Sequence, residues 1–367
     1  MSILTSPEAW QEIATEWDAA ALEANAFYLS YSWLHPWWEA FGRLPLELGI
    51  VWSGHRVIAI APFCRARVWR WGLPVVVVSN LFNAHLARSD VALLEDERRS
   101  LRSLLDDMDR QPWDLLFLRE IPSRSRCLLE LRELSRERGL RLYSQPSLDS
   151  PYINIEGTWE SFERGLSQRF RKSLRNKINR LEAARVEVRF NSFSGVSEVE
   201  GILPDVMRLA SESWSGQRGS SIASPANRRF YEPMMRMMAA RGALKVWTLH
   251  LDDCLASFEI HVACGRTVAA VKASYSPRWA WFSPGSVLEA HVVEELFRSA
   301  QFSRYDLLGK NDFYKRRWTR ELETHEEVFV FNERPLSRAL EAIEFRLRPR
   351  LGAAKRRLWR MQSRFGS

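Results

Sequence analysis

Near the end of the chain, residues 311–318 (NDFYKRRW) place the phenol of Tyr314 next to the amine of Lys315. A phenol can donate a proton to a departing anion, and a lysine cation can stabilise developing negative charge or bind phosphate. Asp306 ends the preceding apolar stretch RYDLLG and could orient Lys315. The pair is therefore a candidate for catalysis. The alternative is a packed tyrosine beside a surface lysine.

A second candidate for proton transfer is the stretch LASFEIHVA. Strand alternation places Ser257, Glu259 and His261 on one face, with apolar residues on the other. A carboxylate and an imidazole two positions apart on the same face can relay a proton. A half-buried pair with only a structural role remains equally open.

The turn SPGS, residues 283–286, has the pattern of a helix start that could hold an anion. Ser283 suits the N-cap, proline suits the first helical position, and Gly285 lets a ligand approach the backbone. We expect the free N–H groups of Gly285, Ser286 and Val287 to face an anion such as phosphate. Ser-Pro-Gly can also simply begin a helix.

Residues 167–182 (SQRFRKSLRNKINRLE) contain six Arg or Lys residues in sixteen positions. At about 100° per residue, Phe170, Leu174, Ile178 and Leu181 form one apolar stripe. The spacing therefore predicts a helix that packs along this stripe and presents a cationic surface on its other faces.

That cationic surface comprises Arg169, Arg171, Lys172, Arg175 and Arg180. It can be a solvated helix face, or it can contact an anionic ligand, for which Arg171 and Lys172 are our candidates. Nucleic acid is the weaker option, because no second helix forms a helix-turn-helix and no aromatic platform accompanies the arginines.

These candidates must be positioned by a mixed α/β fold. Two strand runs, a helix and a short strand occur in the first half of the chain, and the same order recurs in the second. Pro, Ser, Asp and Gly cluster between residues 145 and 157, which favours a domain boundary there. We predict domains at 1–150 and 151–333, followed by a basic tail at 334–367.

Composition narrows the class of protein. The 367 residues are 46% hydrophobic and 27% charged, as in soluble globular proteins of two domains. The four cysteines show no CxxC spacing, which favours free thiols and indicates no metal site. Apolar runs are too short to span a membrane, and no signal-peptide pattern begins the chain. We therefore expect a cytoplasmic protein.

The segment YSPRWAWFSPGSVLEAHVVEELFRSAQFSRYDLLGKNDFYKRRWT resembles the C-terminal motif of GNAT-superfamily acyltransferases associated with cellulose biosynthesis (CelD/BcsL-like). FYLSYSWLHPWWEAFG, RVIAIAPF, WDLLFLREIP and SQRFRKSLRNKINRLE match the same family in the same order. The resemblance extends to about residue 330. It implies two tandem GNAT-like domains, distantly related in layout to Fem-type aminoacyltransferases.

The resemblance also implies transfer of an acyl group from acyl-CoA to an amine, in cell-envelope, polysaccharide or lipid biosynthesis. In such a reaction Tyr314 would protonate the leaving thiolate, and Lys315 would stabilise the oxyanion. Trp214 matches a family tryptophan that packs or lines the acceptor pocket. The usual phosphate loop, Arg/Gln-x-x-Gly-x-Gly/Ala, is absent, and Phe282–Ser286 stand in its place.

The first domain has REIPSR where the second has NDFYKR, so we expect catalysis in the second. From Phe345 to the end, eight basic and no acidic residues occur among scattered apolar ones. This favours a basic amphipathic helix that contacts an anionic membrane at the inner face, although a basic tail without fixed structure is the alternative. The acceptor would be a small molecule or a lipid.

Two further readings stay open at this point. One is a Fem-type transferase that uses aminoacyl-tRNA, with the basic helix contacting RNA. The other is a non-catalytic protein of the same fold that binds anions or membranes.

Overall fold

The computed structural model describes residues 2–4, 6–83, 85–86, 88–213 and 221–347. The chain divides into two compact units. Unit 1 comprises residues 1–6, 44–147 and 326–367, and unit 2 comprises residues 7–43 and 148–325. The N-terminal helices therefore belong to the same unit as the candidate catalytic residues.

Unit 1 is built on a mixed sheet with the strand order β1-β2-β3-β4-β6-β13-β7, and β5 pairs with β3. Its elements are β1 (Ser2–Leu4), β2 (Leu46–Ser53), β3 (Arg56–Arg70), β4 (Leu73–Asn80), β5 (Ala92–Leu93), α4 (Glu97–Met108), β6 (Leu115–Pro122), α5 (Arg126–Glu137), α12 (Pro335–Glu341) and the π-helix η4 (Ala342–Leu347), with parts of β7 (Arg141–Asn154) and β13 (Leu322–Phe331).

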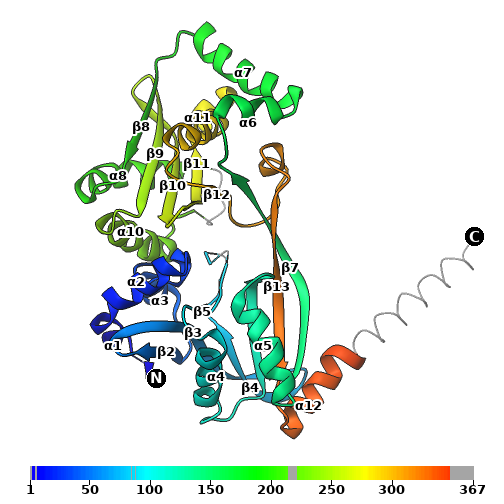
Figure 1. The fold of residues 1–367 in the computed structure, drawn as a ribbon. Coiled ribbons are helices and arrows are strands. Elements are labelled where there is room, and N and C mark those ends of the chain that lie inside the picture. Colours follow the sequence, from blue (N-terminus) through cyan, green and yellow to red (C-terminus); the bar gives the residue numbers. More distant parts are fainter. Residues whose placement is uncertain (1, 5, 84, 87, 214–220, 348–367) are drawn as a thin grey trace, which may run out of the picture. The chain divides into compact units, whose positions relative to one another are not determined.

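Unit 2 has the strand order β7-β12-β11-β10-β9-β8. Its elements are α1 (Pro7–Glu12), α2 (Ala14–Glu23), η1 (Phe27–Leu29), α3 (Tyr31–Phe41), α6 (Trp159–Gly165), α7 (Gln168–Ala183), β8 (Val188–Phe193), α8 (Val196–Glu212), α10 (Pro225–Ala240), β9 (Leu244–Leu251), β10 (Cys254–Cys264), β11 (Thr267–Tyr275), η2 (Pro277–Phe282), α11 (Pro284–Ser299), β12 (Arg304–Asp306) and η3 (Lys315–Arg317) (Figure 1).

The strands β7 and β13 each contribute residues to both units. The division falls between Ser147 and Leu148 in β7, and between His325 and Glu326 in β13. The stretch rich in Pro and Ser from residue 145 onward is therefore mainly strand. Within the described residues, no helix has both the length and the apolar character needed to cross a bilayer.

Both units contain an antiparallel meander, then a helix, then a parallel strand. In unit 1, β4 pairs in parallel with β6, and in unit 2, β11 pairs in parallel with β12. The shared order agrees with the repeat seen in the sequence. The similar stretches WDLL (residues 113–116) and YDLL (residues 305–308) place their aspartates differently, because Asp114 directly precedes β6 whereas Asp306 is the last residue of β12.

The turn between β9 and β10 lies at Asp252–Asp253, where the two adjacent aspartates of LHLDDCLAS predict a turn between strands. Asp252 and Asp253 both have positive φ, at 46° and 63°, as a tight hairpin turn requires. In the next turn, Gly265 has φ 56°, a conformation that glycine adopts without steric cost. These two turns thus connect the three strands of the antiparallel meander β9-β10-β11.

The basic helix α7 forms as predicted, with the Ser167 side chain accepting a hydrogen bond from the Phe170 amide at 3.3 Å. Leu174 and Leu181 are buried, but Ile178 is 45% exposed, so its predicted burial is wrong. Lys177 is buried instead, at 9% exposure. Ile178 lies about 60° from the centre of the buried stripe and Lys177 only about 40°, so geometry favours burying the lysine.

The core of unit 2 lies between its sheet and the helices α7 and α11. It joins buried residues of the two helices, such as Leu181 and Leu288, to strand residues such as Leu249 and Tyr305. Cys64, Cys127, Cys254 and Cys264 are all free thiols, as predicted.

Candidate active site

The predicted pair on β10 meets in the interior of unit 2. His261 Nε2 lies 2.9 Å from Glu259 Oε2, and the Tyr305 hydroxyl lies 3.3 Å from the same imidazole nitrogen. Exposure is 5% for Glu259, 0% for His261 and 1% for Tyr305. A carboxylate, an imidazole and a phenol in hydrogen-bond contact can pass a proton, and burial keeps water from competing.

Tyr314 and Lys315 follow β12 but point to different surroundings. The Tyr314 side chain is 52% exposed, whereas Lys315 is 8% exposed. The Lys315 amine donates to the backbone carbonyls of Leu308 and Lys310, the latter at 3.3 Å. Lys315 therefore holds the loop after β12 closed, which fixes the backbone that carries Tyr314.

The ionisation of both residues is shifted by their surroundings. Burial raises the pKa of the Tyr314 phenol, and the carboxylates of Glu289, Asp312 and Glu259 raise it further. Burial lowers the pKa of Lys315, and nearby carboxylates, including Asp306, oppose that shift. The phenol thus stays protonated at neutral pH and can act as a proton donor.

Asp306 shapes the turn that follows β12. Its Oδ1 accepts a hydrogen bond from the Leu308 amide at 2.9 Å, and its Oδ2 lies 3.8 Å from the Arg304 guanidinium. Leu308 has a positive φ of 47°, a strained conformation for a non-glycine residue. The carboxylate therefore stabilises the strained turn between β12 and Tyr314.

Glu289 on α11 is a candidate that the sequence reasoning missed. Burial raises its pKa to about 8, and the negative charge of Glu259 adds to the increase, while Lys177 and Lys315 act in the opposite direction. A carboxyl that titrates near neutrality is suited to accept and release a proton.

A signal for Glu289 is present in the sequence. Val292, Val293 and Leu296 are buried at three, four and seven positions after Glu289, so the carboxyl is on the apolar face of α11. An acidic residue on such a face is unusual, because a buried carboxylate requires a partner or a function.

Lys177 links α7 to the same centre. Burial lowers the pKa of this lysine, the positive charge of Arg317 lowers it further, and the Glu289 carboxylate opposes the shift. The predicted basic helix therefore contributes its buried lysine to the environment of Glu289.

The start of α11 differs in detail from the expectation. Ser283 takes the N-cap position but has a left-handed backbone, with φ 56°, and its side chain makes no capping bond. The amides of Ser286 and Val287 donate to the Ser283 carbonyl at 3.0 and 3.2 Å. Any contact between these amides and phosphate therefore depends most on Gly285, and this role stays a prediction.

The predicted substrate contacts on α7 are accessible in part. Lys172 is exposed and lines a shallow groove of about 670 Å³ with Arg169 and Arg180. Arg171 is partly buried. Trp214 lies outside the described residues. The roles proposed for these residues remain predictions.

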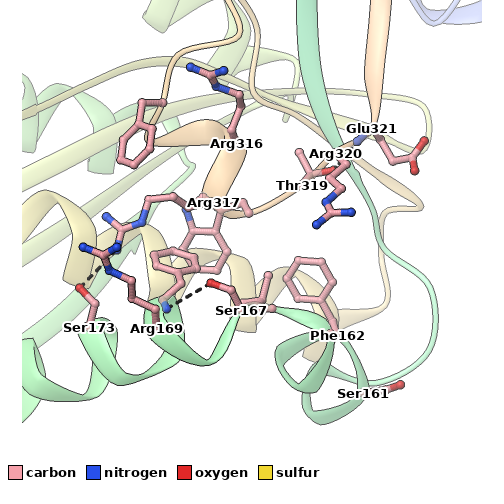
Figure 2. Close-up of a pocket in the computed structure, with 15 residues that line it drawn as sticks. Ser161, Phe162, Ser167, Arg169, Ser173, Arg316, Arg317, Thr319, Arg320 and Glu321 are labelled. Carbon is pink, nitrogen blue, oxygen red and sulfur yellow. Dashed lines mark hydrogen bonds between the residues drawn. The ribbon is translucent and has the colours of Figure 1, made fainter.

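A larger pocket of about 970 Å³ is lined by Phe313 and Arg316, the residues that flank the Tyr314–Lys315 pair in the sequence. It lies between the α6–α7 segment and residues 313–321 (Figure 2). Four arginines line it, namely Arg169, Arg316, Arg317 and Arg320, and aromatic rings form its apolar surface. Within the described ranges, no group of three or more His, Cys, Asp or Glu residues is placed to hold a metal ion.

Residues 168–316 match the sequence profile of the acetyltransferase (GNAT) domain family. Comparison with curated protein sequences gives no match. Among solved structures, FemX has a TM-score of 0.59 at 10% identity, over 93% of this chain and 100% of that one. The C-terminal domain of a protein assigned as a lysylphosphatidylglycerol synthetase in Agrobacterium fabrum has a TM-score of 0.57 at 13% identity, over 91% and 95%. L-PGS from Bacillus licheniformis has 0.50 at 12% identity, over 81% and 88%.

The chain has the GNAT fold.

The GNAT match begins in α7 and ends in η3, so it includes Glu259, His261, Glu289, Tyr314 and Lys315. The predicted mixed α/β GNAT fold is confirmed. The narrower resemblance to the CelD/BcsL-like family stays a prediction. The region that matches the GNAT family and the candidate residues thus coincide in one part of unit 2.

Proposed function

We propose that this chain is an N-acyltransferase that moves an acyl group from acyl-CoA to an amine acceptor, with its active site in unit 2. The observation that carries the proposal is the grouping of Glu259, His261, Tyr305 and Glu289 beside the protonated phenol of Tyr314. Amine acylation requires one group that accepts a proton and another that donates one.

The reaction transfers one acyl group and one proton. The amine nitrogen attacks the thioester carbon, a C–N bond forms, and the carbonyl electrons move to oxygen. The C–S bond then breaks, and its electron pair leaves on sulfur. Glu289, with a pKa of about 8, accepts the proton of the amine, and the Tyr314 phenol protonates the departing thiolate. The pair Glu259–His261 can pass the proton onward.

In this proposal, acyl-CoA binds at β11, β12 and the start of α11. The two strands pair only from Thr267 to Ala269, whereas β11 continues to Tyr275. This leaves the outer half of β11 without β12 as a hydrogen-bonding neighbour, and an extended amide-containing arm can pair with such an edge. Gly285 at the start of α11 is partly exposed and can approach a phosphate.

Lys315 then acts mainly as a positioning residue. Its amine is engaged by the carbonyls of Leu308 and Lys310, which differs from the direct oxyanion role expected for it. Asp306 holds the same turn through Leu308. In this proposal the two residues keep Tyr314 at a fixed distance from the thioester sulfur.

The resemblance to the CelD/BcsL-like family supports the acceptor class and the biological setting that we propose. A sugar amine, an amino acid or an amino-lipid would be acylated in envelope, polysaccharide or lipid biosynthesis, in the cytoplasm or at the inner membrane face. Unit 1 would have no catalytic role. Contact between the basic tail and an anionic membrane also belongs to this proposal, but residues 348–367 lie outside the described part of the chain.

A second candidate function is aminoacyl transfer. Its support is the fold similarity to FemX and to the lysylphosphatidylglycerol synthetase domain over about nine-tenths of the chain. In such a reaction a C–N bond also forms at the amine, but the bond that breaks is the ester between the amino acid and tRNA rather than a thioester. The same base, Glu289, would accept the proton of the amine. The two functions therefore differ in the donor, which is acyl-CoA in the first and aminoacyl-tRNA in the second.

The test is donor binding followed by turnover. We expect acetyl-CoA or a long-chain acyl-CoA to quench the intrinsic tryptophan fluorescence, with no retention of aminoacyl-tRNA at moderate salt. Retention of tRNA without acyl-CoA binding would favour the second function. Binding of neither would leave an anion- or membrane-binding protein of the same fold.

The variant Tyr314→Phe tests the chemistry directly. Loss of the proton donor should lower kcat roughly 10²- to 10⁴-fold with an unchanged Tm, because half of this side chain is exposed and contributes little packing. Steady-state kinetics and thermal unfolding measure the two quantities. Full activity in the variant would remove Tyr314 from the mechanism.

A further inference from the structure

The larger pocket, between the α6–α7 segment and residues 313–321, carries an excess of positive charge. Arg169, Arg316, Arg317 and Arg320 line it, against one acidic residue, Glu321. Figure 2 shows that they come from different segments: Arg169 from α7, Arg316 and Arg317 from η3, and Arg320 from the segment before β13.

Some other arginines of unit 2 form ion pairs with carboxylates. Arg208 pairs with Asp205, and Arg298 pairs with Glu294. Across the described part of the chain, no ion pair with Asp or Glu is found for any of the four arginines of the pocket. Arg317 instead donates to the Ser173 hydroxyl at 3.2 Å.

Like charges around one cavity repel each other, and bound anions remove that repulsion. Arginine forms planar, charge-assisted pairs of hydrogen bonds with phosphate oxygens. The charge of the pocket therefore favours a phosphate group as part of its ligand.

The apolar surface of the pocket indicates what the phosphate is attached to. The buried rings of Phe170 and Trp318 meet edge to face, with centroids 4.8 Å apart. The exposed ring of Phe313 adds to the wall. A volume of about 970 Å³ with an aromatic floor suits an organic phosphate rather than the inorganic ion.

The pocket adjoins the candidate centre through two residues. Trp318 lines the pocket and packs in the same buried cluster as Tyr305, whose hydroxyl contacts His261. Arg317 lines the pocket, and its charge acts on Lys177, which in turn faces Glu289. The pocket and the candidate centre therefore share the buried cluster that contains Trp318 and Tyr305.

We propose that this pocket binds the phosphate group of an organic phosphate and that, resting on the proposed function, this ligand is the amine acceptor. The amine would point towards Tyr314 and Glu289 while the phosphate meets arginines that line the pocket. The phosphate can belong to a lipid headgroup or to a free metabolite, and the chemistry of recognition is the same.

The experiment compares phosphorylated amines with their unphosphorylated partners on the full chain. O-phosphoethanolamine and ethanolamine, titrated by calorimetry, form the soluble pair. Sphinganine 1-phosphate and sphinganine, in phosphatidylcholine vesicles, form the lipid pair, with binding measured by co-sedimentation. Arg316→Gln/Arg320→Gln is the test variant, because both side chains are exposed and their loss should not affect folding. Arg208→Gln, an exposed and paired arginine of the same unit, is the control.

We expect the phosphorylated member of at least one pair to bind the wild type at least about tenfold more tightly than its partner. The double variant should lose most of that preference, at about tenfold per arginine, and Arg208→Gln should keep it. A preference in the soluble pair assigns a free metabolite, and a preference confined to vesicles assigns a lipid. No preference in either pair, or an unchanged preference in the double variant, overturns the inference.

The same variants separate this inference from the proposed function. Acyl-CoA should bind the double variant as tightly as the wild type. If its affinity falls together with the phosphate preference, the pocket holds the donor and the inference is wrong. If the phosphate preference depends on the arginines but no acyl transfer occurs, the pocket assignment stands and the proposed reaction fails.

Discussion

At the scale of single residues, the candidate site depends on groups whose pKa differs from that in water. Glu289 is kept largely protonated at neutral pH by burial and by the charge of Glu259. Tyr314 is kept protonated by burial and by its carboxylate neighbours. A base is therefore obtained only when the pH approaches the pKa of Glu289, whereas the acid is available throughout.

The variant Glu289→Gln should change the pH dependence of both activity and stability. In the wild type, kcat/KM should rise as pH increases through about 8, because the carboxylate is the proton acceptor. The variant should lose this rise and most of the turnover. A pH–rate profile of the two proteins measures the effect, and an unchanged profile would exclude Glu289 as the base.

The sign of the stability effect follows from proton linkage. The pKa of Glu289 is raised from 4.5 to about 8 in the folded protein, so the folded state binds more protons between these values. Its contribution to stability is full below about pH 4.5 and is lost as the pH rises through about 8. Thermal unfolding of Glu289→Gln across this range should show a smaller decline of Tm with pH than the wild type.

At the scale of elements, α7 shows how a charged helix is oriented. Phe170, Leu174 and Leu181 set the buried stripe, and Lys177 lies within it while Ile178 lies outside. Arg169, Lys172 and Arg180 are thereby placed on the faces that line the pocket and the groove.

Leu181→Ala and Ile178→Ala test this orientation as a matched pair on one helix. Leu181 is 1% exposed, so its truncation leaves a cavity and should destabilise the protein by roughly 2–5 kcal/mol. Ile178 is 45% exposed, and its truncation should cost under about 1 kcal/mol. Urea unfolding measures both values. Equal losses at the two positions would show that the stripe is centred elsewhere.

At the scale of the whole molecule, unit 2 is assembled from two distant parts of the chain. Residues 7–43 join residues 148–325, and α3 packs on α10. Asp18 accepts hydrogen bonds from the Ser32 amide and hydroxyl, at 3.1 and 2.8 Å, and forms an ion pair with Arg241. The N-terminal helices are therefore part of the unit that carries the candidate site.

Trp33→Ala tests that assembly. Trp33 on α3 is 2% exposed, and its ring meets Phe230 of α10 with centroids 5.3 Å apart. Its removal should destabilise unit 2 by roughly 3–5 kcal/mol, as for other buried aromatic residues. Trp69→Ala, at 77% exposure in unit 1, is the control and should leave Tm nearly unchanged. If the two variants have the same Tm, the contact between α3 and α10 does not stabilise the protein.

Short-range patterns in the sequence were sufficient for the order of elements, the turn at Asp252–Asp253, the extent of α7 and the meeting of Glu259 with His261. Each of these depends on residues within a few positions of one another, where strand alternation and helical periodicity operate. Helical periodicity also marks Glu289 as a candidate, since it lies on an apolar helix face. Its raised pKa could not be predicted from the sequence. That value arises from burial and from Glu259, Lys177 and Lys315, which lie on other elements.

Three features were decided only by the tertiary structure. They are the hydrogen bond from the Lys315 amine to the Leu308 carbonyl, the pocket lined by arginines, and the membership of residues 7–43 in unit 2. The pocket and unit 2 join segments that are far apart in the sequence, and no local periodicity records which of them pack together. The Lys315 contacts span only a few positions, but they form in an irregular loop to which neither helical nor strand periodicity applies. The amino-acid sequence by itself thus determined which chemical groups are available and on which elements they lie. Folding determined which of them share one low-dielectric centre, where their charges can shift one another's pKa.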